Sequence, residues 1–180
     1  MKLDGPGGFS EFAHARLRPG DTLDVLRPAG LFRLQPQRRH LAVAAGSGIT
    51  PVLAMAEAAL LRGYEFGLVF GNRTPASTMF AAELAELERR FIGRFRVVHV
   101  LSRADRDDSQ HRGRVGADNL PRLLAAARCS VADGQMQYYL CGPVGMVRTV
   151  RSFLADAGVE RRRIHAELFV PPALESLRAS

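Results

Sequence analysis

The sequence predicts an α/β fold built on a five-stranded, parallel, doubly wound sheet. From residue 40 onward, apolar runs of strand length alternate with amphipathic segments of helix length. Most of the apolar runs are apolar throughout, which is typical of parallel strands that helices cover on both faces. Loops rich in Gly, Pro and Ser follow these runs, where a sheet of this kind binds its ligands.

Local signals bound the predicted helices and strands. The first helix has Thr50 as its N-cap, Pro51 at its first position and Gly63 as its stop signal. The last helix begins at Pro143 and ends at Gly158. Strands are expected at 40–46, 65–71, 95–102, 136–142 and 164–169, and helices at 50–63, 78–91, 117–128 and 143–158.

The first 36 residues do not follow this alternation. A short helix is expected within 7–17 and one or two strands within 21–34, with no helix joining them to the sheet. We therefore predict that 1–36 is the end of a preceding β-rich domain, that 37–170 is the α/β domain, and that 171–180 is a linker. The chain is thus expected to be part of a longer protein.

The composition excludes several classes of protein. The chain is 47% hydrophobic, but no apolar run is long enough to span a bilayer and no secretory signal is present. A cytoplasmic location without membrane association is the expectation. There are only two cysteines, without C-x-x-C spacing, and five histidines, without H-x-x-x-H spacing. Neither a disulfide framework nor a metal site is predicted.

The net charge of +7 favours an anionic cofactor or an acidic partner. Nucleic-acid binding would be better supported by a dense basic run with interleaved aromatic residues. The basic residues are instead spread along the chain, apart from the run at 161–163. No nucleic-acid partner is predicted.

Gly46, Ser47 and Gly48 lie between the first strand and the first helix. Glycines let the backbone approach a ligand closely, and a helix N-terminus favours a phosphate. The segment is not G-x-G-x-x-G, so a tight turn explains the glycines about as well as a phosphate site does. The whole octet 44–51, followed directly by a helix, favours the phosphate site.

Ser102 and Arg103 end the third strand. A hydroxyl beside a guanidinium can hold a phosphate monoester, and in a dinucleotide-binding fold this describes an adenosine 2′-phosphate site. Taken alone, the two residues are more simply interpreted as an exposed serine and arginine at the start of a loop. Arg114, later in the same loop, is either a second phosphate contact or a solvated side chain.

Cys141 ends the fourth strand, just before Gly142 and Pro143. On composition alone, a buried core thiol is the favoured interpretation, because no histidine is spaced to pair with it. Glu167 lies in the apolar fifth strand, where a carboxylate is costly unless it is paired or at an exposed end. It is either a functional acid or an ordinary edge residue.

Six motifs occur in order along the chain: "AGSGITP", "FGNRTPASTMF", "VLSR", "GRV", "LCGPVGM" and "AELF". Together they resemble the pyridine-nucleotide half of the ferredoxin–NADP reductase superfamily. The stretches "AAGSGITPVLAM", "GNRTPASTMF" and "ELF" carry a narrower likeness. It is to the reductase components of bacterial multicomponent oxygenases, especially those of phenylacetyl-CoA epoxidases, which implies a place in phenylacetate catabolism.

The resemblance implies NADP(H) as the coenzyme. Ser102 and Arg103 resemble the pair that binds the 2′-phosphate, and Asn72 and Arg73 stand where an acidic residue would suit a free ribose. The cysteine and acid beside the nicotinamide ring match Cys141 and Glu167, which are therefore the predicted catalytic residues. The implied coenzyme-binding set is Gly46, Ser47, Gly48, Thr50, Pro51, Asn72, Arg73, Ser102, Arg103, Arg114, Gly142, Pro143 and Met146.

The resemblance also implies FAD. Gly8 and Ser10 resemble the helix start that holds the FAD pyrophosphate, and Phe169 matches an aromatic position near the flavin. The R-x-Y-S motif of the flavin barrel is missing, so the FAD site is expected to be incomplete in this chain. A [2Fe–2S] centre needs four cysteine ligands and is expected only in a missing ferredoxin domain.

The implied function is that of an NAD(P)H-dependent oxidoreductase. It would pass electrons from NADPH through FAD and a [2Fe–2S] centre to an oxygenase or another iron–sulfur acceptor. Two alternatives stay open. The chain is a truncated module that binds NADP(H) without turnover, or it is the reductase part of a flavohaemoglobin-type protein.

Overall fold

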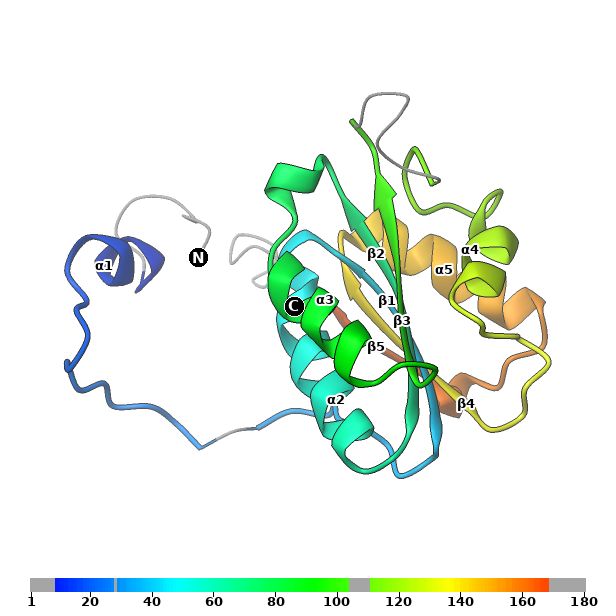
Figure 1. Cartoon of the computed structure of the whole chain (residues 1–180), viewed down its shortest axis with the longest axis horizontal. Helices are drawn as coiled ribbons and strands as arrows, with labels where there is room; N and C mark the ends of the chain where they lie inside the picture. Colours follow the sequence, from blue (N-terminus) through cyan, green and yellow to red (C-terminus); the bar gives the residue numbers. More distant parts are fainter. Residues whose placement is uncertain (1–8, 28, 104–110, 169–180) are drawn as a thin grey trace, which may run out of the picture. The chain divides into compact units, whose positions relative to one another are not determined.

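The structure is a computed structural model that describes residues 9–27, 29–103 and 111–168 (Figure 1). The chain divides into two compact units, Met1–Leu31 and Phe32–Ser180. The described part of the first unit contains one helix, α1 (Phe9–Ala15).

The strands expected within 21–34 do not form among the described residues of that segment. An isolated strand is not stable in water, because its backbone groups need a neighbouring strand as partner. The prediction of a strand in this segment was therefore wrong for the described residues. That 1–36 is the end of a flavin barrel stays a prediction.

The second unit contains a five-stranded sheet in which all the paired strands are parallel. The strand order is β3-β2-β1-β4-β5, which confirms the predicted doubly wound α/β fold (Figure 1). The strands are β1 (Arg39–Ala45), β2 (Glu65–Asn72), β3 (Phe95–Leu101), β4 (Met136–Gly142) and β5 (Ile164–Leu168).

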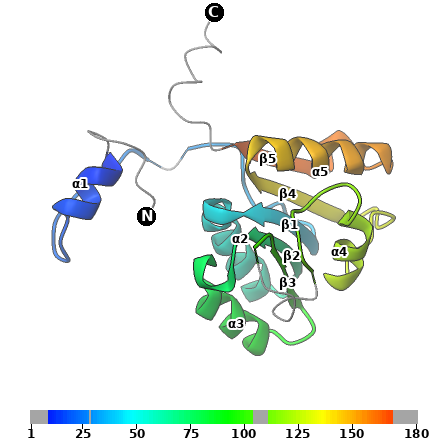
Figure 2. The same cartoon turned by 90° about the horizontal axis from the view of Figure 1, so that it is seen from above.

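Helices cover both faces of this sheet. Helices α2 (Ile49–Leu61) and α3 (Ala81–Arg90) lie on one face, and α4 (Leu120–Ala126) and α5 (Val144–Asp156) lie on the other (Figure 2). Strand β1 serves both cores, because successive side chains of a strand point to opposite faces. Leu41 and Val43 pack with α4 and α5, whereas Ala42 and Ala44 pack with α2 and α3.

Helices α2, α3 and α4 start at positions that the sequence did not predict, and α4 starts at Leu120 where 117 was expected. The segment Gly46–Gly48 forms a 3-10 turn, so α2 starts at Ile49 with Gly48 as its N-cap. Thr50 is therefore not the N-cap, and its hydroxyl donates to the carbonyl of Ser47 at 2.9 Å. Helix α3 starts only at Ala81, because the residue before it, Phe80, has a left-handed backbone with φ of 57°.

The strand order creates a switch point between β1 and β4. The chain runs outward from β1 through β2 to β3, then crosses back to β4 on the other side of β1 and continues to β5. The loops after β1 and β4 therefore leave the carboxyl edge of the sheet in diverging directions, which is where open α/β sheets bind ligands. None of the described helices is long and apolar enough to cross a membrane.

Candidate functional site

The loops after β1 and β4 touch at the switch point. A Cβ atom added at Gly48 would lie 2.2 Å from the carbonyl oxygen of Cys141. Gly142 has φ of 154°, and a Cβ there would lie 2.9 Å from the Cε of Met146 and 3.1 Å from the Ala45 nitrogen. Both positions therefore need glycine, because any side chain would push the two loops apart.

These loops present main-chain N–H groups at the starts of two long helices. Helices α2 and α5 each have 13 residues, no side-chain cap and no acidic residue in the first turn. The first N–H groups of a helix lack intrahelical partners and, with the helix dipole, favour an anion. The structure thus brings the predicted loops 46–51 and 142–146 together into a cradle suited to a pyrophosphate.

Cys141 lies beside this cradle with its side chain fully buried. Burial, with a smaller effect of the Glu167 carboxylate, raises the pKa of the Cys141 thiol to about 12. The thiol is therefore neutral near pH 7 and is not activated as a nucleophile. Glu167 is exposed and pairs with Cys141 in the register of β4 and β5.

A second group of predicted residues lies where β2 and β3 end. The Ser102 amide donates to the Asn72 carbonyl at 3.0 Å, and the Arg103 amide donates to the Arg73 carbonyl at 2.7 Å. These bonds continue the pairing of the strands into their loops and bring the two predicted pairs together. Both arginine side chains are exposed. The side-chain nitrogen of Asn72 is buried and has no hydrogen-bond partner among the described residues.

The loop after Arg73 is stiffened by hydrogen bonds between Thr74, Ser77 and Thr78. The Ser77 amide donates to the Thr74 hydroxyl at 3.3 Å, and the Thr74 amide donates to the Ser77 hydroxyl at 3.0 Å. The Thr78 hydroxyl donates to the Thr74 carbonyl at 3.2 Å. This capping box fixes the backbone that accepts the bond from Arg103.

A hollow of about 610 Å³ lies at the outer side of β3 and reaches this corner. Pro75, Thr78, Leu101 and His111 are among its lining residues. The Nδ1 atom of His111 is buried without a hydrogen-bond partner among the described residues, and burial, followed by the Arg122 charge, lowers the His111 pKa. An unpaired polar atom beside a space of this size suits part of a nucleotide.

Sequence reasoning did not single out Thr78 or His111. Both follow predicted strands, where ligand-binding loops are expected, but nothing in their spacing shows that they share one hollow. Arg114 is exposed, and its carbonyl accepts a bond from the Asn119 side chain at 2.8 Å. It is not among the residues that line the hollow.

The predicted flavin residues cannot be placed beside this site. Gly8 and Phe169 lie outside the described residues, as does the side chain of Ser10. Among the described residues, no group of three or more His, Cys, Asp or Glu side chains could hold a metal ion. The two cysteines of the chain are too few for the four thiolate ligands of a [2Fe–2S] cluster.

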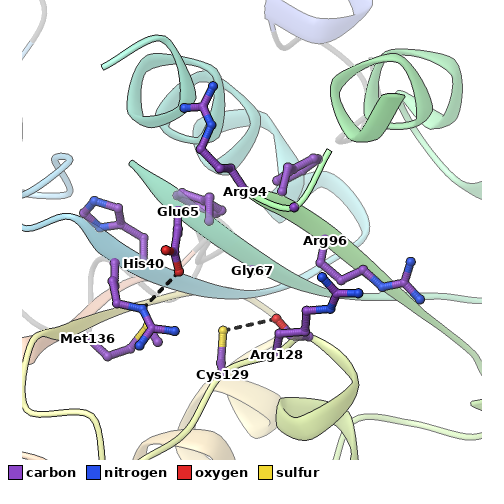
Figure 3. A pocket seen from close by; sticks show the side chains of 13 residues that line it. His40, Glu65, Gly67, Arg94, Arg96, Arg128, Cys129 and Met136 are labelled. Carbon is purple, nitrogen blue, oxygen red and sulfur yellow. Dashed lines mark hydrogen bonds and ion pairs between the residues drawn. The ribbon is translucent and has the colours of Figure 1, made fainter. Parts of the chain in front are cut away.

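A separate pocket lies at the opposite, amino edge of the sheet (Figure 3). Its walls come from the starts of β1 to β4 and from the loop after α4, and none of the predicted site residues lines it. Cys129 is held there with its sulfur against Gly67, since a Cβ added at Gly67 would lie 2.6 Å from that sulfur. The Cys129 thiol donates to the Ala127 carbonyl at 3.3 Å.

The switch-point cradle, the exposed arginines at the ends of β2 and β3, and the parallel sheet together define a dinucleotide-binding domain. Residues 42–152, which are more than half of the chain, match the family model of the oxidoreductase NAD-binding domain. The chain belongs to this family, and with it to the ferredoxin–NADP reductase superfamily.

Relatives of the chain carry the same module inside longer proteins. The 1,2-phenylacetyl-CoA epoxidase of Escherichia coli has one component that is 35% identical over 181 residues, which cover 96% of this chain and 50% of that component. Ferredoxin–NADP reductase B from Sorangium cellulosum is 34% identical over 173 residues, covering 93% of this chain and 69% of that protein. The chain thus spans about half the length of the epoxidase component.

A solved structure shows the same fold. The flavohaem-like FAD/NAD-binding domain of nitric oxide dioxygenase from Vibrio cholerae is 25% identical, with a TM-score of 0.77. The match covers 91% of this chain and 65% of that domain.

Proposed function

We propose that the chain is the NADP(H)-binding part of an electron-transfer reductase that takes its reducing equivalents from NADPH. The observation that carries this proposal is the glycine cradle, in which Gly48 and Gly142 leave two uncapped helix starts open at the switch point. When it is bound, the coenzyme supplies a hydride for transfer to a flavin. The proposal rests on the described residues for binding and on the family for chemistry.

Three parts of the coenzyme would meet three groups of residues. The N–H groups at the starts of α2 and α5 would hold the pyrophosphate. Ser102 and Arg103 would bind the 2′-phosphate, with Arg73 nearby, because guanidinium groups hold phosphate oxygens with charge-assisted bonds. The buried nitrogen of Asn72 supports this placement, since it needs a partner that the described protein atoms do not provide.

Cys141 and Glu167 would position the nicotinamide ring. The neutral Cys141 thiol cannot attack the ring, and because it is buried in the core on the side of α2 and α3 it would support the floor behind the ring. Glu167 adds a carboxylate at the end of β5, beside that floor, where it can accept a hydrogen bond or favour positive charge on the ring. Together they would orient the reacting carbon and exclude water.

The rest of the electron route lies outside the described residues. FAD would be held with the help of Gly8, Ser10 and Phe169, and a [2Fe–2S] centre would sit in a ferredoxin domain beyond this chain. The electron acceptor would be an oxygenase component, and the similarity to an epoxidase component favours an oxygenase of phenylacetyl-CoA type.

Arg103→Ala tests the coenzyme site. Loss of one charge-assisted contact should weaken NADPH binding roughly tenfold or more and leave NADH binding nearly unchanged. The measurement is isothermal titration of both coenzymes into the chain, and Arg151→Ala, an exposed arginine on α5, is the matched control. Equal losses for NADPH and NADH in Arg103→Ala would show that Arg103 does not contact the 2′-phosphate.

A module that binds NADP(H) without turnover is the first alternative. Tight NADPH binding in a colourless protein that reduces no dye would favour it. A flavohaemoglobin-type reductase is the second alternative, and the match to the Vibrio cholerae domain supports it. A globin sequence upstream of Met1 would decide for that alternative, and a ferredoxin sequence downstream of Ser180 would decide for the oxygenase reductase.

A further inference from the structure

The pocket at the amino edge of the sheet is lined by four arginines, Arg39, Arg94, Arg96 and Arg128, and by one acidic residue, Glu65. It lies at the end of the sheet opposite the switch-point cradle (Figure 3), and of its four arginines only Arg96 also lines the hollow beside β3. An arginine whose side chain is already paired with a carboxylate or carbonyl of the protein is not available to a ligand. The partners of the four arginines therefore decide what the pocket can bind.

Two of the arginines have clear structural partners. Arg39 pairs with the carboxylates of Glu65 at 3.1 Å and Asp133 at 2.6 Å. Arg94 donates to the Leu60 carbonyl at 2.9 Å, at the end of α2, and in Figure 3 its side chain points away from Arg96 and Arg128. Because Arg39 pairs with Glu65, the negative charge of the Glu65 carboxylate is neutralised.

The other two arginines are exposed and make few contacts with protein atoms. Arg96 has one carboxylate contact, 3.9 Å to Glu88, and that carboxylate already accepts a bond from the Val97 amide at 2.8 Å. No hydrogen bond or ion pair of the Arg128 side chain is found within the described ranges. Figure 3 shows Arg96 and Arg128 on the same side of the pocket. Two such guanidinium groups present donors that match the oxygens of one phosphate or carboxylate.

The backbone of Arg128 caps the end of α4. Arg128 has φ of 58°, the left-handed conformation just past the end of the helix, where glycine is the usual residue. The backbone amides of Arg128 and Cys129 bond the Ala125 and Leu124 carbonyls, which is the Schellman pattern. The Arg128 side chain takes no part in this cap and is therefore available to a ligand.

The floor of the pocket does not oppose an anion. Burial raises the pKa of the Cys129 thiol to about 12, so the sulfur carries no negative charge near pH 7. The cavity holds only about 30 Å³, which is the room of about one water molecule. It therefore admits one oxygen of an oxyanionic group, and the rest of that group would lie outside the cavity beside Arg96 and Arg128.

We propose that Arg96 and Arg128 form an oxyanion-binding site at the amino edge of the sheet, which holds a phosphate or carboxylate group. The group comes either from a small phosphorylated molecule or from an acidic side chain of a partner protein. The two sources share the chemistry that the site recognises.

The test is an NMR titration of the 180-residue chain with inorganic phosphate at fixed ionic strength. Amide signals of Gly93 and Cys129 report the amino edge, and those of Ser47 and Gly142 report the coenzyme edge. In the wild type, and equally in Arg103→Ala, the amino-edge signals should shift and saturate. Arg128→Gly should weaken this binding roughly tenfold or more, while its unfolding midpoint stays the same or rises because glycine suits the left-handed position.

Arg96→Gln should show the same loss, and Arg151→Ala should behave as the wild type. A second titration uses a hexaglutamate peptide at the same ionic strength, and the tighter of the two probes identifies the source of the anion. Unsaturable shifts with both probes, or the same affinity in Arg128→Gly, Arg96→Gln and the wild type, would overturn the proposal. Arg103 lies at the coenzyme edge, so a loss of coenzyme binding in Arg103→Ala should not change the phosphate titration at the amino edge.

Discussion

The two edges of the sheet differ in the atoms that pack there. Backbone atoms meet at the carboxyl edge, and side chains meet at the amino edge. At the carboxyl edge, Gly48 and Gly142 let two loops meet through their backbones. At the amino edge, the Cys129 sulfur packs against Gly67, and the side chains of Arg96 and Arg128 line the pocket there. A site made of backbone depends on glycine and tolerates almost no substitution, whereas a site made of side chains can be changed one group at a time.

Gly48→Ala should give the largest effect and tests the backbone edge directly. The new Cβ would meet the Cys141 carbonyl at 2.2 Å, and no rotamer can relieve that conflict. We expect a loss of about 2–3 kcal/mol in the free energy of unfolding, with loss of NADPH binding. Urea unfolding and coenzyme titration measure both.

Gly145→Ala is the control for this prediction. A Cβ there meets nothing within 4 Å, and the residue lies in α5, so its stability should be unchanged or higher. If Gly48→Ala were as stable as Gly145→Ala, the two loops would not meet as described.

The pH dependence of stability should come next in size, and it belongs to the amino end of β1. His40 is buried against the rings of Tyr64, Phe66 and Tyr139. Burial lowers its pKa from 6.5 to about 4. Below pH 6.5, His40 becomes protonated in the unfolded chain but stays neutral in the folded chain until the pH approaches 4. The free energy of unfolding is therefore constant above pH 6.5 and falls as the pH drops toward 4.

This effect should amount to about 2 kcal/mol between pH 7 and pH 4.5. Urea unfolding at the two pH values measures it, and His40→Gln, which does not titrate, is the comparison. The difference between the two pH values should shrink in the variant. An unchanged difference would mean that other histidines cause the acid loss.

Gly67→Ala should lower the free energy of unfolding less than Gly48→Ala does. Unlike for Gly48→Ala, a second substitution should restore most of the lost stability. The added Cβ would meet the Cys129 sulfur at 2.6 Å, a side-chain atom that can be removed. We expect a loss of about 1–2 kcal/mol, of which most returns when Cys129→Ala is added. Unfolding of the two single variants and the double variant gives the coupling energy. Additive losses would show that sulfur and Cβ do not compete for this space.

Ser77→Ala should have the smallest effect and reaches the coenzyme corner through a loop. It removes the hydrogen bonds that the Ser77 hydroxyl makes with Thr74 and leaves the bond from the Ser77 amide, so stability should fall by about 0.5–1 kcal/mol. NADPH affinity should fall a few-fold more than NADH affinity, because the Arg73 carbonyl holds Arg103 less firmly. The exposed Ser152→Ala on α5 is the control, and equal coenzyme ratios in both variants would contradict this role.

Much of this protein could be predicted from its sequence because the relevant signals are local. Apolar periodicity located the strands and helices of the sheet, and strand β4 was placed at its observed bounds, Met136–Gly142. The glycines of the switch point and the Ser102–Arg103 pair were identified from their position after strands. Position along the chain is enough for this, since carboxyl ends of parallel strands share one edge.

Tertiary structure alone decided the features that depend on contacts between distant segments. The contact of Gly48 with the Cys141 carbonyl, the meeting of Thr78 and His111 at one hollow, and the start of α2 before Thr50 all depend on neighbours that no spacing reveals. The arginine pocket has the same origin: Arg96 and Arg128 are 32 positions apart in the sequence, and only the packing of the loop after α4 against β2 and β3 brings them to one cavity. Local patterns specify elements, whereas long-range packing decides which side chains share a site.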